Sequence, residues 1–195
     1  RDGAWLVHIG SLALTDGADA TLWEEFFIAC HRHGIVTSLD PNVRPSFVAD
    51  RDRYITRLER IFQYADIIKL SNEDLAWIYP QMDLSAAFGH LVSMSSIGLR
   101  VLTRGADGVV ARSTAAKIEA PAQPIQSLAD TVGAGDTFMA SMLTWLVDHE
   151  VRDQKVIHAL SSDQLAAMMA YAAKAAAMNC EKHGCHPPFR KELLS

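Results

Sequence analysis

The residues best suited to chemistry lie at positions 130–136, which read Asp-Thr-Val-Gly-Ala-Gly-Asp and run directly into an apolar helical pattern. Two glycines around an alanine allow a tight turn into a helix, whose first N–H groups then form an anion site. An acid at this place repels phosphate, but it can act as a base for a hydroxyl that attacks a phosphoryl group held by those amides. Two interpretations of Asp136 therefore stay open, this base and a simple helix N-cap, and Asp130 is likewise compatible with a turn residue.

The elements that must position this segment are short apolar runs alternating with helical patterns. We expect strands at 4–9, 35–39, 67–70, 100–103, 109–112 and 117–119. We expect helices at 20–33, 51–62, 75–79, 84–94, 134–147 and 163–179. This alternation predicts a doubly wound α/β fold, a mainly parallel sheet with helices on both faces, over a single domain spanning 1–195. Ligands of such sheets bind beyond the carboxyl ends of the strands, which directs attention to the loops after Leu39, Leu70, Thr103 and Leu128.

Composition limits the class of protein. The 195 residues are 49% apolar and 21% charged with a formal net charge of −5, which argues against disorder and against a nucleic-acid partner. No apolar stretch is long enough for a membrane span, and no signal peptide is recognisable, so we expect no membrane association and a cytoplasmic protein whose three cysteines are reduced. The chain begins at Arg1 shortly before a core strand and without Met, which is typical of a fragment.

Six segments resemble those of the ribokinase-like (PfkB) carbohydrate kinases, and among them the bacterial fructokinases, and they occur along the chain in the family's order. The string 130–136 is similar to the second signature of the family, and Asp-Pro-Asn-Val-Arg-Pro at 40–45 is similar to its D-P-N-x-R segment. The other matching segments are 65–74, the Thr-Arg-Gly-Ala-Asp-Gly turn at 103–108, the closing loop at 184–188 and the opening 8–14. The resemblance implies that this chain is the carboxyl-terminal, ATP-binding part, because the amino-terminal sugar-binding portion and its β lid, a common site of homodimerisation, are absent.

The resemblance also implies roles for individual residues. Asp136 would be the base, and the amides of Ala134, Gly135 and Asp136, after a turn shaped by Gly133, would form the anion hole. Arg44 would contact phosphate, with a surface arginine as the alternative. The residues implied in nucleotide binding are Thr103, Gly105, Gly108, Asn72, Lys69 and Asn179. For the two turn glycines the alternative is an ordinary hairpin, and for Asn179 it is a helix C-cap.

Two metal sites follow from the same resemblance. The acid linked to Mg²⁺ through water would be Glu73 or Asp74, although both also suit the start of a helix. Asp130 and the carbonyl of Val132 would bind the monovalent cation, K⁺, that some relatives carry.

The function implied is an ATP-dependent sugar kinase, most similar to a fructokinase that converts fructose into fructose 6-phosphate. The alternatives are a 2-keto-3-deoxygluconate kinase or a nucleoside kinase of the same family. A catalytically silent nucleotide-binding fragment is a third alternative, because the sugar-binding portion is missing.

Overall fold

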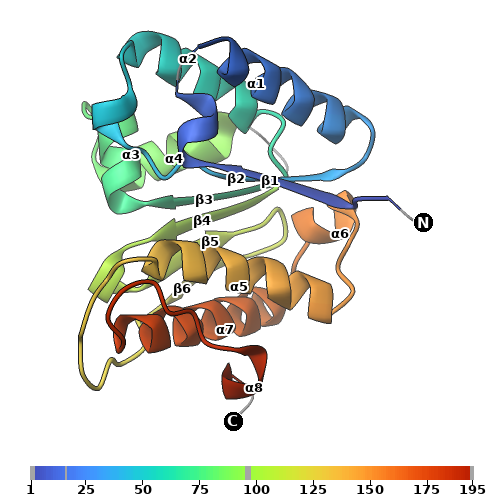
Figure 1. Ribbon diagram of the computed structural model, residues 1–195. Coiled ribbons are helices and arrows are strands. Elements are labelled where there is room, and N and C mark those ends of the chain that lie inside the picture. The colour runs from blue at the N-terminus through green and yellow to red at the C-terminus, as the bar shows by residue number, and fades with distance from the viewer. Residues whose placement is uncertain (1–2, 16, 95–97, 194–195) are drawn as a thin grey trace.

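The computed structural model describes residues 3–15, 17–94 and 98–193, and it contains one mixed β-sheet (Figure 1). The strand order is β1-β2-β3-β4-β5-β6. The strands are β1 (Leu6–Gly10), β2 (Val36–Asp40), β3 (Ile67–Ser71), β4 (Leu99–Thr103), β5 (Val109–Arg112) and β6 (Lys117–Ala120). The first four are parallel, and β5 and β6 continue the sheet as antiparallel strands, which confirms the mainly parallel α/β sheet.

Helices cover both faces of this sheet (Figure 1). The crossovers between the parallel strands place α1 (Gly17–Arg32), α2 (Arg51–Phe62), α3 (Asn72–Ile78) and α4 (Leu84–Met94) on one face. The other face carries α5 (Ala134–Asp148), α6 (Gln154–His158) and α7 (Ser162–Cys180), and α8 (Arg190–Leu193) follows near the end of the chain. Short 3₁₀ turns lie at Ser11–Leu14, Pro45–Phe47 and Gly105–Asp107.

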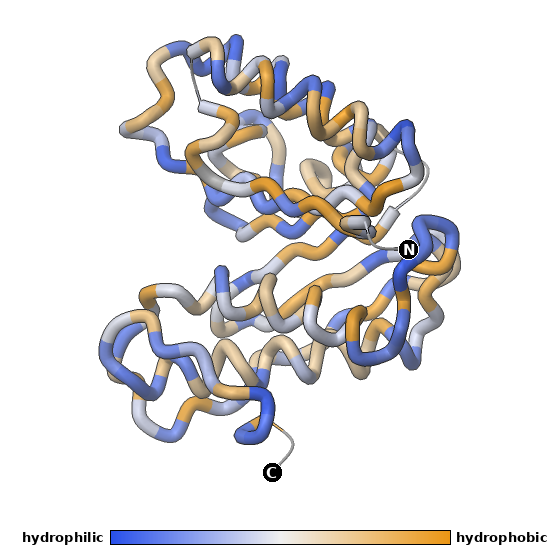
Figure 2. The backbone as a smooth tube through the Cα atoms, turned by 45° about the vertical axis from the view of Figure 1, so that its right-hand side comes forward, coloured by the Kyte–Doolittle hydropathy of each residue, from blue (hydrophilic) through white to orange (hydrophobic). Residues whose placement is uncertain are grey.

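Two hydrophobic cores lie on opposite faces because successive side chains of a strand point in opposite directions. In β3, Ile67 packs toward α5 and α7, whereas Ile68 and Leu70 pack toward α1–α4. Figure 2 shows the result, with hydrophobic residues along the central strands and hydrophilic ones mostly on loops and outer helix surfaces. None of the helices among the described residues has the length and hydrophobicity needed to cross a bilayer.

Two helices begin three residues earlier than expected, α1 at Gly17 rather than at residue 20 and α3 at Asn72 rather than at residue 75. A capping box makes the earlier start of α3 possible: Ser71 Oγ accepts from the Asp74 amide, and the Asp74 carboxylate accepts from the Ser71 amide. The helices α6 and α8 were not expected, because five and four residues are too short to display a helical period.

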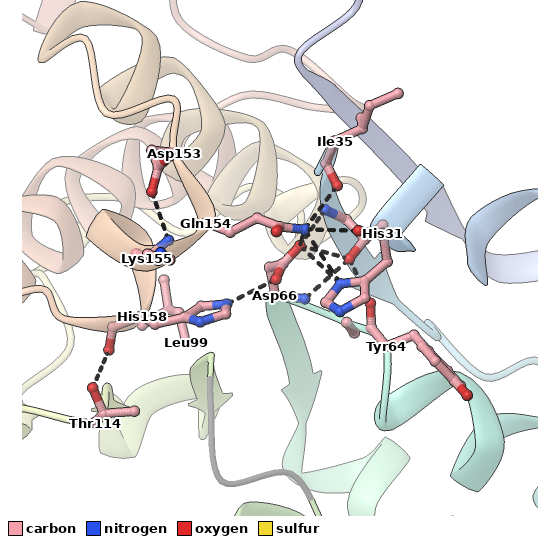
Figure 3. Close-up of polar contacts among 12 residues, drawn as sticks. His31, Ile35, Tyr64, Asp66, Leu99, Thr114, Asp153, Gln154, Lys155 and His158 are labelled. Carbon is pink, nitrogen blue, oxygen red and sulfur yellow. Dashed lines mark hydrogen bonds and ion pairs between the residues drawn. The ribbon is translucent and has the colours of Figure 1, made fainter. Parts of the chain in front are cut away.

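A buried carboxylate ties the two layers together at the amino-terminal end of β3 (Figure 3). Asp66 is 1% exposed and accepts hydrogen bonds from the amide and hydroxyl of Thr37, both at 2.8 Å. The ring of His158 lies 2.7 Å and that of His31 3.4 Å from its oxygens, and Gln154 donates at 3.1 Å. Asp66 thus links β2, α1 and α6.

Burial alone would raise the pKa of Asp66, but the hydrogen bonds from His158 and Thr37 outweigh it and lower the pKa below the usual 3.8. A lowered folded-state pKa adds stability above the unfolded value, and this stability is lost as the pH falls through the folded value. We therefore expect Asp66→Asn to reduce the free energy of unfolding by about 1.5–3 kcal/mol at pH 7, and by progressively less below about pH 4.

Urea unfolding at pH 7, 5 and 3 measures this difference. Glu25→Gln, which neutralises an exposed carboxylate on α1, is the matched control and should leave stability nearly unchanged. An Asp66→Asn variant as stable as the parent at pH 7 would contradict the stabilising role of the carboxylate.

Candidate functional site

The carboxyl ends of the parallel strands meet the first turn of α5 at one edge of the sheet. Gly10 is in register with Asp40, and Ser71 is in register with Thr103, so the ends of β1–β4 lie side by side. The amide of Asn42, after β2, bonds the carboxylate of Asp136 on α5. Three of the four loops to which the sequence directs attention therefore lie at one edge, and the fourth leads into α5.

The first turn of α5 is built on a left-handed glycine. Gly133 is the N-cap with φ 75° and ψ 2°, a conformation that favours glycine, and its carbonyl accepts the first helical bond from Thr137 at 2.8 Å. A side chain at Gly133 would also overlap Cys185 Sγ. Because Gly133 is the cap, Asp136 is the third helical residue, and the interpretation of Asp136 as an N-cap is wrong.

The amides of this turn are not equivalent. Of the three amides expected to form the anion hole, that of Ala134 already donates to the Thr131 carbonyl at 3.2 Å. The N–H groups of Gly135 and Asp136 have no acceptor within the described part of the chain. Two outward-pointing amides at a helix amino terminus remain available for an anion.

The Asp136 carboxylate is exposed and is oriented by the loop after β2. Asn42 Nδ2 donates to Asp136 Oδ1 at 3.2 Å, and Arg44 Nη1 donates to Asn42 Oδ1 at 2.5 Å. Asn42 has a φ of 42°, which is uncommon outside glycine and aims its amide across the site. Arg44 is exposed and holds Asn42 in place, while its contact with phosphate stays a prediction.

A buried ion pair lies beneath the same turn. Lys69 Nζ is 2.8 Å from Asp40 Oδ2, and both side chains are 4% exposed. A side chain on Gly135 would lie 3.1 Å from Lys69 Nζ, so the ammonium group lies directly against the turn that carries the free amides. Burial raises the pKa of Asp40 although the charge of Lys69 opposes it, and Asp40 Oδ1 has no hydrogen-bond partner in the described residues.

The turn between β4 and β5 carries the three residues expected to approach the nucleotide. Thr103 Oγ1 donates to the Leu70 carbonyl at 3.3 Å, and Gly105, with φ 56°, faces open space. Gly108 has φ 87°, and a side chain there would overlap the carbonyl oxygen of Ala120. The close approach of the chain after β6 is therefore a sufficient reason for glycine at 108, whereas Gly105 is open to a ligand.

The two acids left open for magnesium differ in availability. Asp74 is buried, and its oxygens accept from the amide of Val43 at 2.7 Å and from the amide and hydroxyl of Ser71. It is therefore part of the fold, and its assignment as the metal-linked acid does not fit. Glu73 is exposed in the first turn of α3, next to the half-buried Asn72. No three His, Cys, Asp or Glu side chains gather into a metal site in the ranges that the structure describes.

The closing loop packs against the Gly133 turn. Asp130 accepts from the amides of Val132 and Gly184, both at 3.0 Å, and these bonds lower its pKa. Asn179 is fully buried, donates to the Val132 carbonyl at 2.8 Å and accepts from the His186 amide at 2.8 Å. Asn179 is not the C-cap, since α7 continues to Cys180. In this structure the oxygens of Asp130 and Val132 hold the loop, and a monovalent cation there stays a prediction.

A hollow of about 250 Å³ opens beside Asp136. Its polar lining comes from His8, Asp40, Asn42 and Asp136, with Gly10 between them. Met139, Ala140 and Leu143, which follow Asp136 on α5, form its apolar wall. An apolar wall together with several polar groups is suited to a small ligand that carries hydroxyl groups.

Sequence reasoning passed over three of these residues as site members: Asn42, Asp40 and His8. Asn42 follows a proline, and asparagine tolerates the left-handed region, so its position in Asp-Pro-Asn carried a usable signal. A lysine within the apolar run 67–70 requires a buried partner, which identifies an acid at the end of a neighbouring strand. His8 lies in the segment 8–14 that resembles the family, but its spacing from other polar residues did not indicate a role in the site.

Comparison with known proteins finds related sequences. Residues 3–192 match the pfkB family carbohydrate kinase. The chain is 31% identical over 164 residues to a fructokinase of Rhizobium leguminosarum bv. trifolii, covering 84% of this chain and 49% of that protein. It is 34% identical over 151 residues to a fructokinase of Klebsiella pneumoniae, covering 77% of this chain and 48% of that protein.

Solved structures show the same fold. A fructokinase from Xylella fastidiosa with bound ATP superposes with a TM-score of 0.82 at 24% identity, over 97% of this chain and 60% of that one. An aminoimidazole riboside kinase from Salmonella enterica, complexed with aminoimidazole riboside and an ATP analog, gives 0.81 at 22% identity, over 97% and 61%. The chain thus spans about half the length of the curated relatives it matches.

The contact between Asn42 and Asp136 can be tested without straining the backbone. Asn42→Gly keeps the left-handed conformation but removes the amide that orients the carboxylate, so we expect kcat for phosphoryl transfer to fall about 10- to 100-fold. Steady-state kinetics on the protein in its full natural length measures this.

Thermal unfolding is the control, and the midpoint should stay near that of the parent because glycine relieves the positive φ of residue 42. Unchanged kcat in a folded Asn42→Gly protein would show that Asp136 needs no positioning by this loop.

Proposed function

The chain belongs to the pfkB family of carbohydrate kinases, and from this premise we propose that the protein is an ATP-dependent sugar kinase with fructose as its acceptor. The observation that carries the proposal is the exposed carboxylate of Asp136, oriented by Asn42, beside the two acceptor-free amides of α5. A base next to an anion site is the arrangement that phosphoryl transfer to a hydroxyl requires.

In the proposed reaction, Asp136 takes the proton of the attacking hydroxyl. Its Oδ1 accepts from Asn42, and its Oδ2 accepts no hydrogen bond from the described residues, which leaves Oδ2 for the acceptor. The hydroxyl oxygen bonds to the γ-phosphorus as the bond from that phosphorus to the bridging oxygen breaks, and ADP leaves. The product is a sugar phosphate, fructose 6-phosphate for fructose.

The amides of Gly135 and Asp136 stabilise the negative charge on the transferring group, and Lys69, packed against Gly135, adds a positive charge. Gly105 and Thr103 border the nucleotide, and Arg44 reaches its phosphates from the loop after β2. Mg²⁺, when bound to the nucleotide, neutralises phosphate charge. Glu73 is the available acid that would hold its hydration shell, because the oxygens of Asp74 are engaged by backbone and hydroxyl groups.

Fructose is supported by the curated relatives, which are named fructokinases, and by the similarity of segments 8–14, 40–45 and 184–188. The aminoimidazole riboside kinase shares the fold at 22% identity, so a nucleoside acceptor belongs among the compounds to be tested.

We expect the protein in its full natural length to phosphorylate fructose in preference to ribose, adenosine, aminoimidazole riboside and 2-keto-3-deoxygluconate, in an assay coupled to ADP release. Asp136→Asn should lower kcat by about 10²- to 10⁴-fold, because it removes the proton acceptor while preserving shape. Its affinity for an ATP analogue should be kept, since the substitution removes a negative charge near the phosphates.

Calorimetry with the analogue and thermal unfolding are the controls for nucleotide binding and folding. Preference for another acceptor would overturn fructose and leave the kinase class standing. An Asp136→Asn variant that retains more than about a tenth of kcat would exclude Asp136 as the base.

A further inference from the structure

His8 is a polar group of the hollow beside Asp136 to which the proposed phosphoryl transfer gives no role. It lies on β1, and its side chain is exposed at the wall of the hollow. Its Nδ1 is 3.1 Å from the hydroxyl of the fully buried Ser38 on β2, a contact that fixes the orientation of the ring. The other ring nitrogen, Nε2, makes no hydrogen bond to any residue that the structure describes.

Gly10 leaves the space in front of this nitrogen open. A side chain at Gly10 would lie 3.7 Å from His8 Nε2 and 3.0 Å from the Asp40 carbonyl oxygen. Without one, the imidazole edge borders the same hollow as Asn42, Asp136 and the apolar wall of α5.

The charges around His8 decide what this nitrogen can bind. Partial desolvation of the ring by the atoms packed around it, followed by the charge of Lys69, lowers the pKa of His8 below its usual 6.5, although Asp136 opposes the change, so the neutral ring predominates at pH 7. A neutral imidazole has one donor and one acceptor nitrogen, and a hydroxyl group pairs with either because it both donates and accepts. The contact with a hydroxyl therefore does not depend on which tautomer Ser38 selects.

The charges that line the hollow disfavour an acidic ligand. Asp40 and Asp136 line the hollow, and because Lys69 balances the charge of Asp40, it is the carboxylate of Asp136 that acts on a charged ligand. A carboxylate on the acceptor would be repelled here, whereas an uncharged polyol gains a hydrogen bond and packs its carbon skeleton on the wall of Met139, Ala140 and Leu143.

We propose that His8 binds a hydroxyl group of the acceptor through Nε2 and thereby selects an uncharged polyhydroxy compound over a sugar acid. This inference rests on the proposed kinase function and adds to it a residue that determines acceptor specificity. His8 touches the acceptor and takes no part in proton transfer, so its contribution is expected in the KM for the acceptor.

Two substitutions at residue 8 test the inference in the protein of full natural length. His8→Phe keeps an aromatic ring but cannot form the hydrogen bond, and we expect it to raise the fructose KM about 3- to 10-fold with the KM for ATP unchanged. His8→Gln retains a donor and an acceptor and should recover part of the loss. His33→Phe, which replaces an exposed histidine just after α1, is the matched control and should leave both constants unchanged.

The outcomes separate the two proposals. If the unaltered protein turns over no acceptor at all, both the kinase function and the role of His8 are overturned. If it phosphorylates fructose and His8→Phe shows the parental fructose KM, only the role of His8 fails. A preference of the unaltered protein for 2-keto-3-deoxygluconate over fructose would also refute the selection of an uncharged acceptor.

Discussion

The buried ion pair between Lys69 and Asp40 is the interaction on which the geometry of the site depends. Each charge is almost inaccessible to water, and neither is stable there alone, because desolvation of an unpaired ion is unfavourable by several kcal/mol. The pair joins the last residue of β2 to the middle residue of the neighbouring strand β3 and places an ammonium group against Gly135. The first turn of α5 therefore packs against the ammonium group of Lys69, although the two are far apart in the sequence.

The groups around the first turn of α5 attract opposite charges. The free amides of Gly135 and Asp136 and the ammonium of Lys69 favour negative charge, whereas the Asp136 carboxylate on the same turn is the proposed proton acceptor. Asn42 keeps that carboxylate directed across the hollow. An anion site and a base are thereby held on rigid elements at one edge of the sheet. Asp66, with its hydrogen-bond partner His158, lies at the opposite edge.

Periodicity predicted most of the fold because each strand and long helix buries a regular apolar face. The bounds of α2 and α4 agree with the sequence pattern to the residue, whereas α3 starts three residues early because of the hydrogen bonds between Ser71 and Asp74. The segment 130–136 predicted a turn, an anion site and an acid. It did not predict that the Thr131 carbonyl occupies the Ala134 amide, or that Gly133 rather than Asp136 caps the helix. Such facts depend on φ angles and on contacts between residues far apart in the chain, as between Asn42 and Asp136, and no local pattern encodes them.

The most direct test of the central claim separates the structural task of the ion pair from its electrostatic one. Lys69→Met alone should destabilise the protein by about 3–5 kcal/mol, because it leaves Asp40 buried and unpaired. The double variant Lys69→Met with Asp40→Leu should regain most of that stability. It should still bind an ATP analogue about tenfold or more weakly, because the ammonium group is the partner that lies against Gly135, even though the net charge of the site is unchanged. Calorimetry on the double variant decides the matter: weak binding by a well-folded protein is the predicted result, and parental affinity would contradict the claim that Lys69 supplies the charge of the anion site.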